Sequence, residues 1–327
     1  MPQPHIPRRP RYERIAPSAP FKVTDRDLEI VHYVYQHRFL TSDQITALTG
    51  GSQQGVSRRL NLLFHAGWLD RPRAQLLMPD RLDSRCNHAM IYALGNNGAK
   101  YLSGELDLPL STINWTAKNS GLKNGFFFEH TLWVAEFMVM VRLACRKGKR
   151  LEFISQEEIV NSRRTLPAAP SKELGFEVEV LLRKDQRKPY TVPVVPDAAF
   201  GLRRLGSSKE QEEMYFFLEA DRATMPIRRA SLYRSSFYKK MLGYYHAWKT
   251  GAWGATFHFK NARVLTITTS MERIGNMVAM GREIDPWKKG LGMFLFAPRA
   301  SFSLDQPQQV FERVWIAGNG KKVSILD

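Results

Sequence analysis

The sequence predicts a mixed α/β (α+β) protein in which a small helical unit precedes a larger domain with a central mixed sheet. In the N-terminal part, apolar residues recur at helical spacing in short segments separated by turn residues. Within residues 192–224, two strand-like apolar runs flank a polar loop, and each run ends in carboxylates. Strands and helices alternate towards the C-terminus, which is typical of a sheet covered by helices on both faces.

Composition narrows the class of partner. The chain has 327 residues, of which 43% are hydrophobic, and this is enough for two packed domains. Its formal charge of +17 favours a polyanion, and we expect double-stranded DNA rather than an acidic membrane surface. No apolar run is long enough to cross a membrane and the N-terminus lacks a signal segment, so we expect a cytoplasmic protein. Cys86 and Cys145 fit no metal-ligand spacing, which agrees with a reducing compartment.

Four segments are expected along the chain. Residues 1–22 are rich in proline and arginine, which predicts a disordered basic arm, either lying on phosphates or simply unstructured. Residues 23–102 form the small unit and residues 103–120 a linker. Residues 121–327 form the larger domain.

The small unit begins with two predicted helices. Thr24 to Asp27 has the pattern of a capping box, and the helix that it opens is expected to end near His37. Ser42 is the expected N-cap of a second, short helix.

A third helix and a hairpin complete this unit. Gly50 and Gly51 form a turn, and a helix is predicted over residues 52–66. Extended segments follow at Trp68 and over residues 91–94, with a basic loop between them. This order predicts a winged helix-turn-helix that binds DNA, with a protein-binding three-helix bundle as the alternative.

The residues expected on the DNA face have side chains that reach base edges and phosphates. They are Gln53, Gln54, Ser57, Arg58, Arg59, Asn61, Arg71 and Arg73.

The larger domain opens with an apolar helix over residues 126–146. Glu136 lies among large hydrophobic residues in this helix, and because an unpaired buried carboxylate is costly, Glu136 is a candidate metal ligand. A basic helix rich in aromatic residues is predicted after the two acidic runs, over residues 227–249. The other expected strands and helices are strands over residues 151–159, 176–183, 264–268 and 293–296, a helix over 271–280 and a strand pair within 310–326.

Three acids stand at the ends of the two apolar runs. Asp197 follows a proline, while Glu219 and Asp221 are two residues apart and so point to the same face of a strand. Clustered carboxylates repel one another unless a cation lies between them, so Mg²⁺ or Mn²⁺ is the expected cofactor. An acid on one strand and Glu-x-(acid or Lys) on the next is the layout of the PD-(D/E)xK nuclease core.

The lysine of that layout is missing, because its position is occupied by Asp221. Lys239 and Lys240, on the following helix, are the candidates to supply the catalytic cation, and Arg222 is a weaker one. A covalent tyrosine is the other route to a DNA nick. The tyrosines near the acids are Tyr233, Tyr238, Tyr244 and Tyr245, but aromatic core packing is favoured for each, and we prefer a metal-activated water.

Taken together in this order, several segments of residues 22–315 resemble the replication-relaxation family of plasmid and mobile-element proteins. These segments are the predicted winged helix, the PDAAF and FLEADRAT motifs, the KKMLGYY helix and VLTITTSMERIGNM. The family is similar to the MOB-C class of relaxases, which nick DNA with a restriction-endonuclease-like core. The resemblance implies that Asp197, Glu219 and Asp221 bind metal and that Lys239 or Lys240 is the basic catalytic residue.

Three functions follow as expectations. The first is a metal-dependent, site-specific endonuclease (nickase or relaxase) at the origin of a plasmid or mobile element. The second is a catalytically inactive DNA-binding regulator of replication or transcription, in which the acids are remnants. The third is an accessory protein that works with a separate mobilisation or replication protein.

Overall fold

The computed structural model describes most of the chain, namely residues 11–15, 21–78, 89–116, 119, 125–161, 174–180, 188–206, 213–229, 234–257, 262–285, 287 and 290–327. These residues form a mixed α/β protein with two compact units, Met1–Glu136 and Phe137–Asp327. The division falls inside a long helix, later than the linker predicted over residues 103–120. Cys86 and Tyr233 lie outside the described residues.

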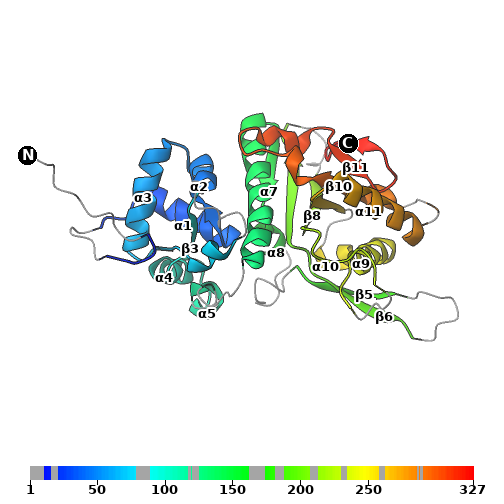
Figure 1. The fold of residues 1–327 in the computed structure, drawn as a ribbon, viewed down its shortest axis with the longest axis horizontal. Helices are drawn as coiled ribbons and strands as arrows, with labels where there is room; N and C mark the ends of the chain where they lie inside the picture. Colours follow the sequence, from blue (N-terminus) through cyan, green and yellow to red (C-terminus); the bar gives the residue numbers. More distant parts are fainter. Residues whose placement is uncertain are drawn as a thin grey trace, which may run out of the picture. The chain divides into compact units, whose positions relative to one another are not determined.

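The first unit combines short helices with a small antiparallel sheet of order β1-β3-β2 (Figure 1). Its elements are α1 (Asp25–His37), β1 (Leu40–Thr41), α2 (Ser42–Thr49), α3 (Gln53–His65), β2 (Leu69–Asp70), η1 (Arg73–Leu77), β3 (Ile91–Leu94), α4 (Asn96–Glu105) and α5 (Leu110–Ile113).

Side-chain caps fix where the first helices begin. At α1, Asp27 Oδ2 accepts a hydrogen bond of 2.7 Å from the Thr24 backbone N–H, as the predicted capping box requires. At α2 the predicted cap is wrong by one residue, because Thr41, not Ser42, is the N-cap. Thr41 Oγ1 accepts from Gln44 N at 3.2 Å, and Gln44 Oε1 accepts from Thr41 N at 2.9 Å. This reciprocal pair satisfies two helix-end donors, whereas Ser42 as the cap would place no Gln or Glu at the matching position.

The described part of the N-terminal arm packs against the first unit. The Arg14 guanidinium donates to Phe64 O at 2.9 Å, to Leu69 O at 3.1 Å and to Asp70 Oδ1 at 2.8 Å. Residues 11–15 therefore differ from the disordered arm expected from their composition, because arginine can bond carbonyls at the end of a neighbouring helix.

The second unit is built on a seven-stranded mixed sheet of order β12-β11-β10-β9-β8-β7-β4. The neighbours β8, β9 and β10 are parallel, and the other pairs are antiparallel. The strands are β4 (Leu151–Ile154), β7 (Ala198–Arg204), β8 (Glu213–Asp221), β9 (Ala262–Thr268), β10 (Phe294–Pro298), β11 (Trp315–Ala317) and β12 (Lys322–Val323), while β5 (Phe176–Val180) and β6 (Tyr190–Val194) form a separate antiparallel pair.

Helices cover both faces of the large sheet, as predicted. The long helix α7 (Phe126–Gly148) begins in the first unit and ends in the second, where Figure 1 shows it on one face. The other helical elements are α8 (Gln156–Asn161), α9 (Phe237–Thr250), α10 (Ala252–Phe257), α11 (Met271–Ile284), η3 (Leu291–Met293), η4 (Arg299–Ser301) and η5 (Pro307–Phe311). None of the described helices is long and apolar enough to span a membrane.

The basic helix predicted over residues 227–249 starts later than expected. Helix α9 begins at Phe237, after Ser236, whose side chain accepts a hydrogen bond from Lys239 N. The backbone N–H groups of Phe237 and Tyr238 instead donate to Pro226 O and Ile227 O. The described residues before α9, 222–229 and 234–236, are therefore not helical, and Pro226 and Ile227 lie beside the first residues of α9.

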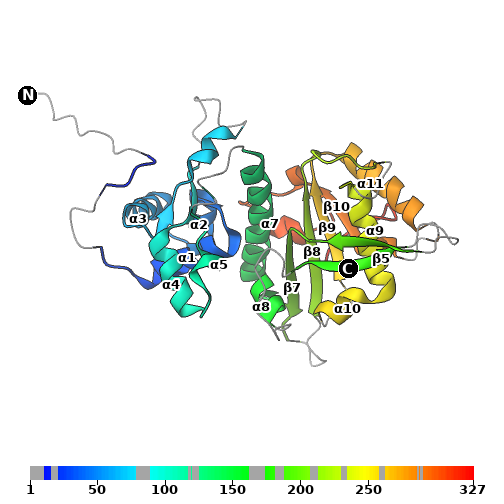
Figure 2. The ribbon, with the colours of Figure 1, turned by 90° about the horizontal axis from the view of Figure 1, so that it is seen from below.

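The core of the second unit lies on both faces of β8, with α7 on one side of the strand and α9 on the other (Figure 2). Phe216 stacks on Phe200 of β7 with ring centroids 4.9 Å apart, and Phe200 contacts Phe137 of α7. Phe217 instead meets Tyr244 of α9 at 5.7 Å. Because side chains alternate along a strand, the odd-numbered residues at the end of β8 face α9.

Candidate active site at the carboxyl end of β8

Asp197 is held beside β8 by the backbone. It directly precedes β7, whose first residue Ala198 is paired with Leu218 of β8. The N–H of Asp197 donates to Leu218 O at 3.1 Å, and its Oδ2 accepts from Ala220 N at 2.8 Å. These bonds place the Asp197 carboxylate at the level of Glu219 on the neighbouring strand.

Glu219 is the centre of the site and is 2% exposed. Lys240 Nζ donates to Glu219 Oε2, and Tyr244 OH donates to Oε1 at 2.7 Å. Lys240 Nζ also lies 3.9 Å from Asp197 Oδ1. Lys240 and Tyr244 are one helical turn apart on α9, so both project onto the same part of β8.

Burial and neighbouring charges set the protonation of this cluster. Burial raises the pKa of Glu219 to about 7, and the Asp197 carboxylate adds to this rise while Lys240 opposes it. For Lys240, burial lowers the pKa, but the carboxylates of Glu219 and Asp197 outweigh burial and leave the pKa above its ordinary value. Burial and the Glu219 carboxylate both raise the pKa of the Tyr244 hydroxyl. Lys240 therefore stays charged, whereas Glu219 can exchange a proton near neutral pH.

Asp221 has a different set of partners, although it shares a face with Glu219. Arg273 of α11 binds it with two hydrogen bonds, from Nε to Oδ2 at 2.6 Å and from Nη2 to Oδ1 at 2.8 Å. Thr268 Oγ1 on β9 donates to Asp221 Oδ2 at 2.8 Å. Arg273 Nη2 also donates to Met225 O at 2.6 Å, which ties down the chain after β8.

Arg273 was missed by the sequence reasoning. The available signal was a basic residue in the first turn of a helix that directly follows a predicted strand. That signal is weak on its own, because the sequence does not reveal that β9 is parallel to β8 and brings α11 next to Asp221.

The acidic side chains of the site can be compared with the ligands that the predicted Mg²⁺ or Mn²⁺ ion needs. Within the described residues, no group of three or more His, Cys, Asp or Glu side chains is arranged to hold a metal. Asp197 and Glu219 nevertheless supply hard carboxylate oxygens around one cation, Lys240. Mg²⁺ is commonly bound by one or two carboxylates together with waters and substrate phosphates, so the chemistry of this pair suits the ion, and metal binding by Asp197, Glu219 and Asp221 stays a prediction.

The remaining candidates contribute less to this site. Glu136 is half-buried and is the last residue of the first unit, and its role as a metal ligand stays a prediction. Lys239 is one residue from Lys240 and so leaves α9 about 100° further round the helix. Tyr238 stacks with Arg228 and Tyr245 packs against Trp248, which agrees with the packing roles favoured for them.

The predicted DNA-contacting residues of the first unit fall into two groups. Four of them lie exposed on α3, and these are Gln53, Gln54, Ser57 and Arg58. Arg73 is exposed as well and pairs with Glu13 at 3.0 Å.

The other three predicted contacts, Arg59, Asn61 and Arg71, are less exposed and are bound within the unit, while the exposed Gln53 donates to Asp43 Oδ1 at 2.6 Å. Arg59 Nε donates to the fully buried carboxylate of Asp27 at 2.6 Å. Arg71 is only 8% exposed, and its guanidinium bonds Asn61 Oδ1 at 3.0 Å and Tyr92 OH at 3.1 Å. Arg71 is therefore buried among residues of its own unit, which differs from an exposed side chain on a binding face, and its contact with DNA stays a prediction.

Comparison with known proteins gives one match. A family model described as replication-relaxation matches residues 31–259, which extend from α1 past α10 and include Asp197, Glu219 and Lys240. No curated protein and no solved structure matches the chain.

Proposed function

The chain belongs to the replication-relaxation family, and from this premise we propose that it serves the replication or mobilisation of a plasmid or mobile element as a DNA endonuclease that nicks one strand. The observation that supports catalysis is the placement of Lys240 beside two carboxylates from neighbouring segments, Asp197 and Glu219. Two acids and a lysine are the chemical set of a PD-(D/E)xK site, here with the lysine supplied by a helix.

Each residue has a distinct role in this proposal. Asp197 and Glu219 would hold Mg²⁺ or Mn²⁺, which when bound polarises the scissile phosphate and lowers the pKa of a water. Lys240 places a permanent positive charge where negative charge develops on the phosphate. Tyr244 fixes the orientation of Glu219 through the hydrogen bond to Oε1. Asp221 and Arg273 hold the strand end and the following segment in position.

Recognition of the DNA is assigned to the first unit. Helices α1, α2 and α3 and the small antiparallel sheet support the proposal of a winged helix-turn-helix, with α3 as the recognition helix. The exposed side chains Gln53, Gln54, Ser57 and Arg58 would contact the double-stranded DNA. A further mobilisation or replication protein is a proposed partner at the same origin.

Nicking of supercoiled plasmid tests the proposal. The full chain is incubated with plasmid carrying the origin of its element, with Mg²⁺ or Mn²⁺ and with EDTA as the blank. We expect open circles with the wild type and none with Glu219→Gln or Lys240→Gln. Lys249→Gln removes an exposed charge from the same helix and is the matched control. Nicking that survives both site variants would refute the assigned residues.

A non-catalytic DNA-binding regulator is the second candidate. It is favoured by the observation that Lys240 already neutralises Glu219 and that Asp221 is engaged by Arg273. In that case the protein would bind the origin tightly, and no metal ion would convert the plasmid to open circles.

A further inference from the structure

Thr266 of β9 carries a buried hydroxyl group close to the candidate active site. The residue is 0% exposed, and among the residues that the structure describes none bonds its Oγ1. An unpaired hydroxyl in the interior destabilises a folded protein, whereas valine, which has a similar shape, carries no such loss. A threonine at this place is therefore expected to have a hydrogen-bond partner in another state of the site.

Strand pairing places Thr266 beside Glu219. In the parallel pair of β8 and β9, Thr266 is the partner of Glu219, and Thr268 is the partner of Asp221. Partner residues on neighbouring strands project from the same face of a sheet. Thr268 makes use of this position, because its Oγ1 donates to Asp221 Oδ2 at 2.8 Å. Strand β9 therefore places one threonine next to each of these two carboxylates.

The bonds of Glu219 explain why Thr266 is not used in the same way. Both Glu219 oxygens accept from α9, Oε2 from Lys240 Nζ and Oε1 from Tyr244 OH at 2.7 Å. On its other side, Thr266 is paired with Phe296 of β10, a buried ring without a conventional acceptor. Glu219 is therefore the polar residue of the two strand partners, and it becomes available when a donor from α9 leaves.

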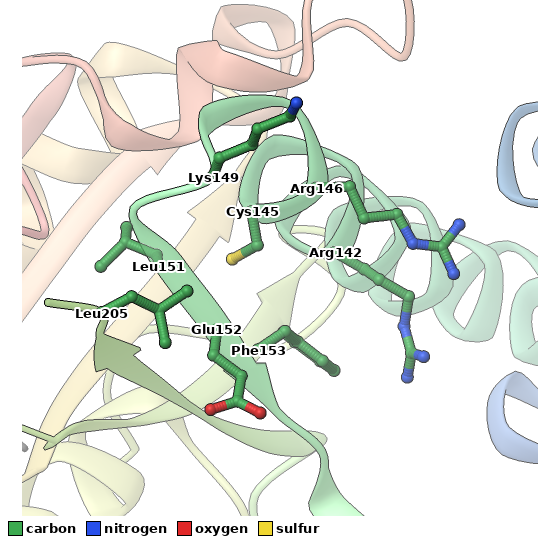
Figure 3. A pocket seen from close by; sticks show the side chains of 8 residues that line it. All are labelled: Arg142, Cys145, Arg146, Lys149, Leu151, Glu152, Phe153 and Leu205. Atoms are coloured by element: carbon green, nitrogen blue, oxygen red, sulfur yellow. The ribbon is translucent and has the colours of Figure 1, made fainter.

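The hydroxyl of Thr266 differs from the charged groups of a pocket on the α7 side of the sheet (Figure 3). This pocket is formed by the end of α7 and by β4. Glu152 in its wall pairs with Arg203 at 2.7 Å. The guanidinium carbon of Arg142 lies 4.7 Å from the centroid of the Phe153 ring, which holds the group in place. These groups already have partners within the protein, so they give no comparable sign of a second state.

We propose that Thr266 is a positioning residue, which donates a hydrogen bond to Glu219 when Lys240 moves from Glu219 to the scissile phosphate. The proposal rests on the proposed function, in which Lys240 acts on that phosphate. A staggered χ1 rotamer takes a threonine Oγ1 of β9 towards β8, as Thr268 shows. Tyr244 keeps its bond to Glu219 throughout. Two donors then hold the carboxylate both before and after Lys240 leaves, so Glu219 stays in place for the reaction.

The test is a double-mutant cycle, measured by urea unfolding of the full chain in EDTA and without DNA. Lys240→Met removes the ammonium group from Glu219 and represents the state after Lys240 has left. In that background Thr266→Val should raise the equilibrium constant of unfolding about tenfold, because the bond to Glu219 is lost. With Lys240 in place, Thr266→Val should leave the constant unchanged or lower it, because the hydroxyl is unpaired.

Two other substitutions on β9 serve as controls. Thr266→Ser keeps the hydroxyl and should change the constant by the same factor in both backgrounds. Thr268→Val breaks the existing bond to Asp221 and should raise the constant about tenfold in both. Lys240→Ala provides a second background, and far-ultraviolet circular dichroism verifies that each variant is folded.

An equal factor for Thr266→Val in both backgrounds would overturn the proposal. So would a loss with Thr266→Ser that appears only when Lys240 is absent, because the hydroxyl would then not be the group responsible. Failure of the proposed nuclease appears separately, as absence of nicking by the wild type in Mg²⁺ or Mn²⁺, and leaves the unfolding result unaffected.

Discussion

Each unit of the molecule contains a buried carboxylate bound to a cation, and the two pairs differ in their electrostatics. In the first unit, Asp27 is fully buried and accepts hydrogen bonds from Arg59 and Thr24. Burial acts to raise its pKa, but the bonds from Arg59 and Thr24 outweigh burial and hold the pKa below 3.8. In the second unit, burial raises the pKa of Glu219 to about 7 in spite of Lys240.

The difference comes from what surrounds each pair. Asp27 both accepts from the Thr24 N-cap in the capping box of α1 and binds Arg59, so each of these hydrogen bonds stabilises its charged form. Glu219 has a second carboxylate, Asp197, within reach of the same lysine, and that like charge opposes its ionisation. A carboxylate with some neighbours that favour its ionisation and others that oppose it is characteristic of functional sites. A carboxylate whose hydrogen-bond partners all favour ionisation is characteristic of structural sites. The comparison therefore supports a stabilising role for Asp27 and Arg59, and it agrees with the catalytic role proposed for Glu219 and Lys240.

The largest expected effect concerns activity at the second pair. Glu219→Gln should lower the nicking rate about a thousandfold. Its free energy of unfolding should stay within about 1 kcal/mol of the wild type, because Glu219 has a pKa of about 7 and the folded chain therefore already accommodates its neutral form near pH 7. Plasmid nicking and urea unfolding measure the two quantities. A large loss of stability would contradict the assignment of this pair to chemistry.

The first pair should show the opposite behaviour. Asp27→Asn should lower the free energy of unfolding by about 3 kcal/mol at pH 7, since it leaves Arg59 without its buried partner. The depressed pKa of Asp27 stabilises the folded chain above pH 3.8, and this contribution is lost as the pH falls through the folded value. The difference in free energy of unfolding between the variant and the wild type should therefore become smaller as the pH falls. Urea titrations at several pH values would show a constant gap if the pair were unimportant.

A smaller effect is expected where Asp221 meets Arg273. Arg273→Lys keeps the charge but loses the two-bond contact, and should destabilise the chain by about 2 kcal/mol. Nicking should fall about tenfold, since the segment after β8 would no longer be held by the bond to Met225 O. Arg282→Lys, at an exposed site on α11, is the control. Identical unfolding curves for the two variants would show that Arg273 is not a positioning residue.

The smallest effect separates neighbouring arginines on α3. Arg58→Ala should leave stability unchanged and reduce the slope of log DNA affinity against log salt by about 0.9, the value for one phosphate contact. Arg59→Ala should mainly lower stability, since its side chain is committed to Asp27. Fluorescence anisotropy over a salt series and urea unfolding distinguish the two arginines. An equal change in slope for both would place Arg59 on the DNA face after all.

Much of the fold was predictable because local patterns specify local structure. The capping box at Thr24 predicted α1, alternating residues predicted β5, and a helical pattern predicted α11. Predictions from local sequence patterns were wrong where a second residue or a more distant contact could satisfy the same backbone groups. Ser42 and Thr41 both qualify as caps, and the bonds with Gln44 decided between them. The segment before α9 has helical periodicity, but its carbonyls accept from the first residues of α9 instead.

The sequence by itself determined the mixed α/β class, the placement of Glu219 and Asp221 on one face of a strand and the two lysines that could reach the acids. Only the tertiary structure decided how those charges are paired. Lys240 lies against Asp197 and Glu219 because α9 packs on the face of β8 that carries the odd-numbered residues. Asp221 instead forms an ion pair with Arg273, because β9 lies next to β8 and is followed by α11. Strand order and helix packing join residues far apart in the chain, and residue periodicity does not encode those distances.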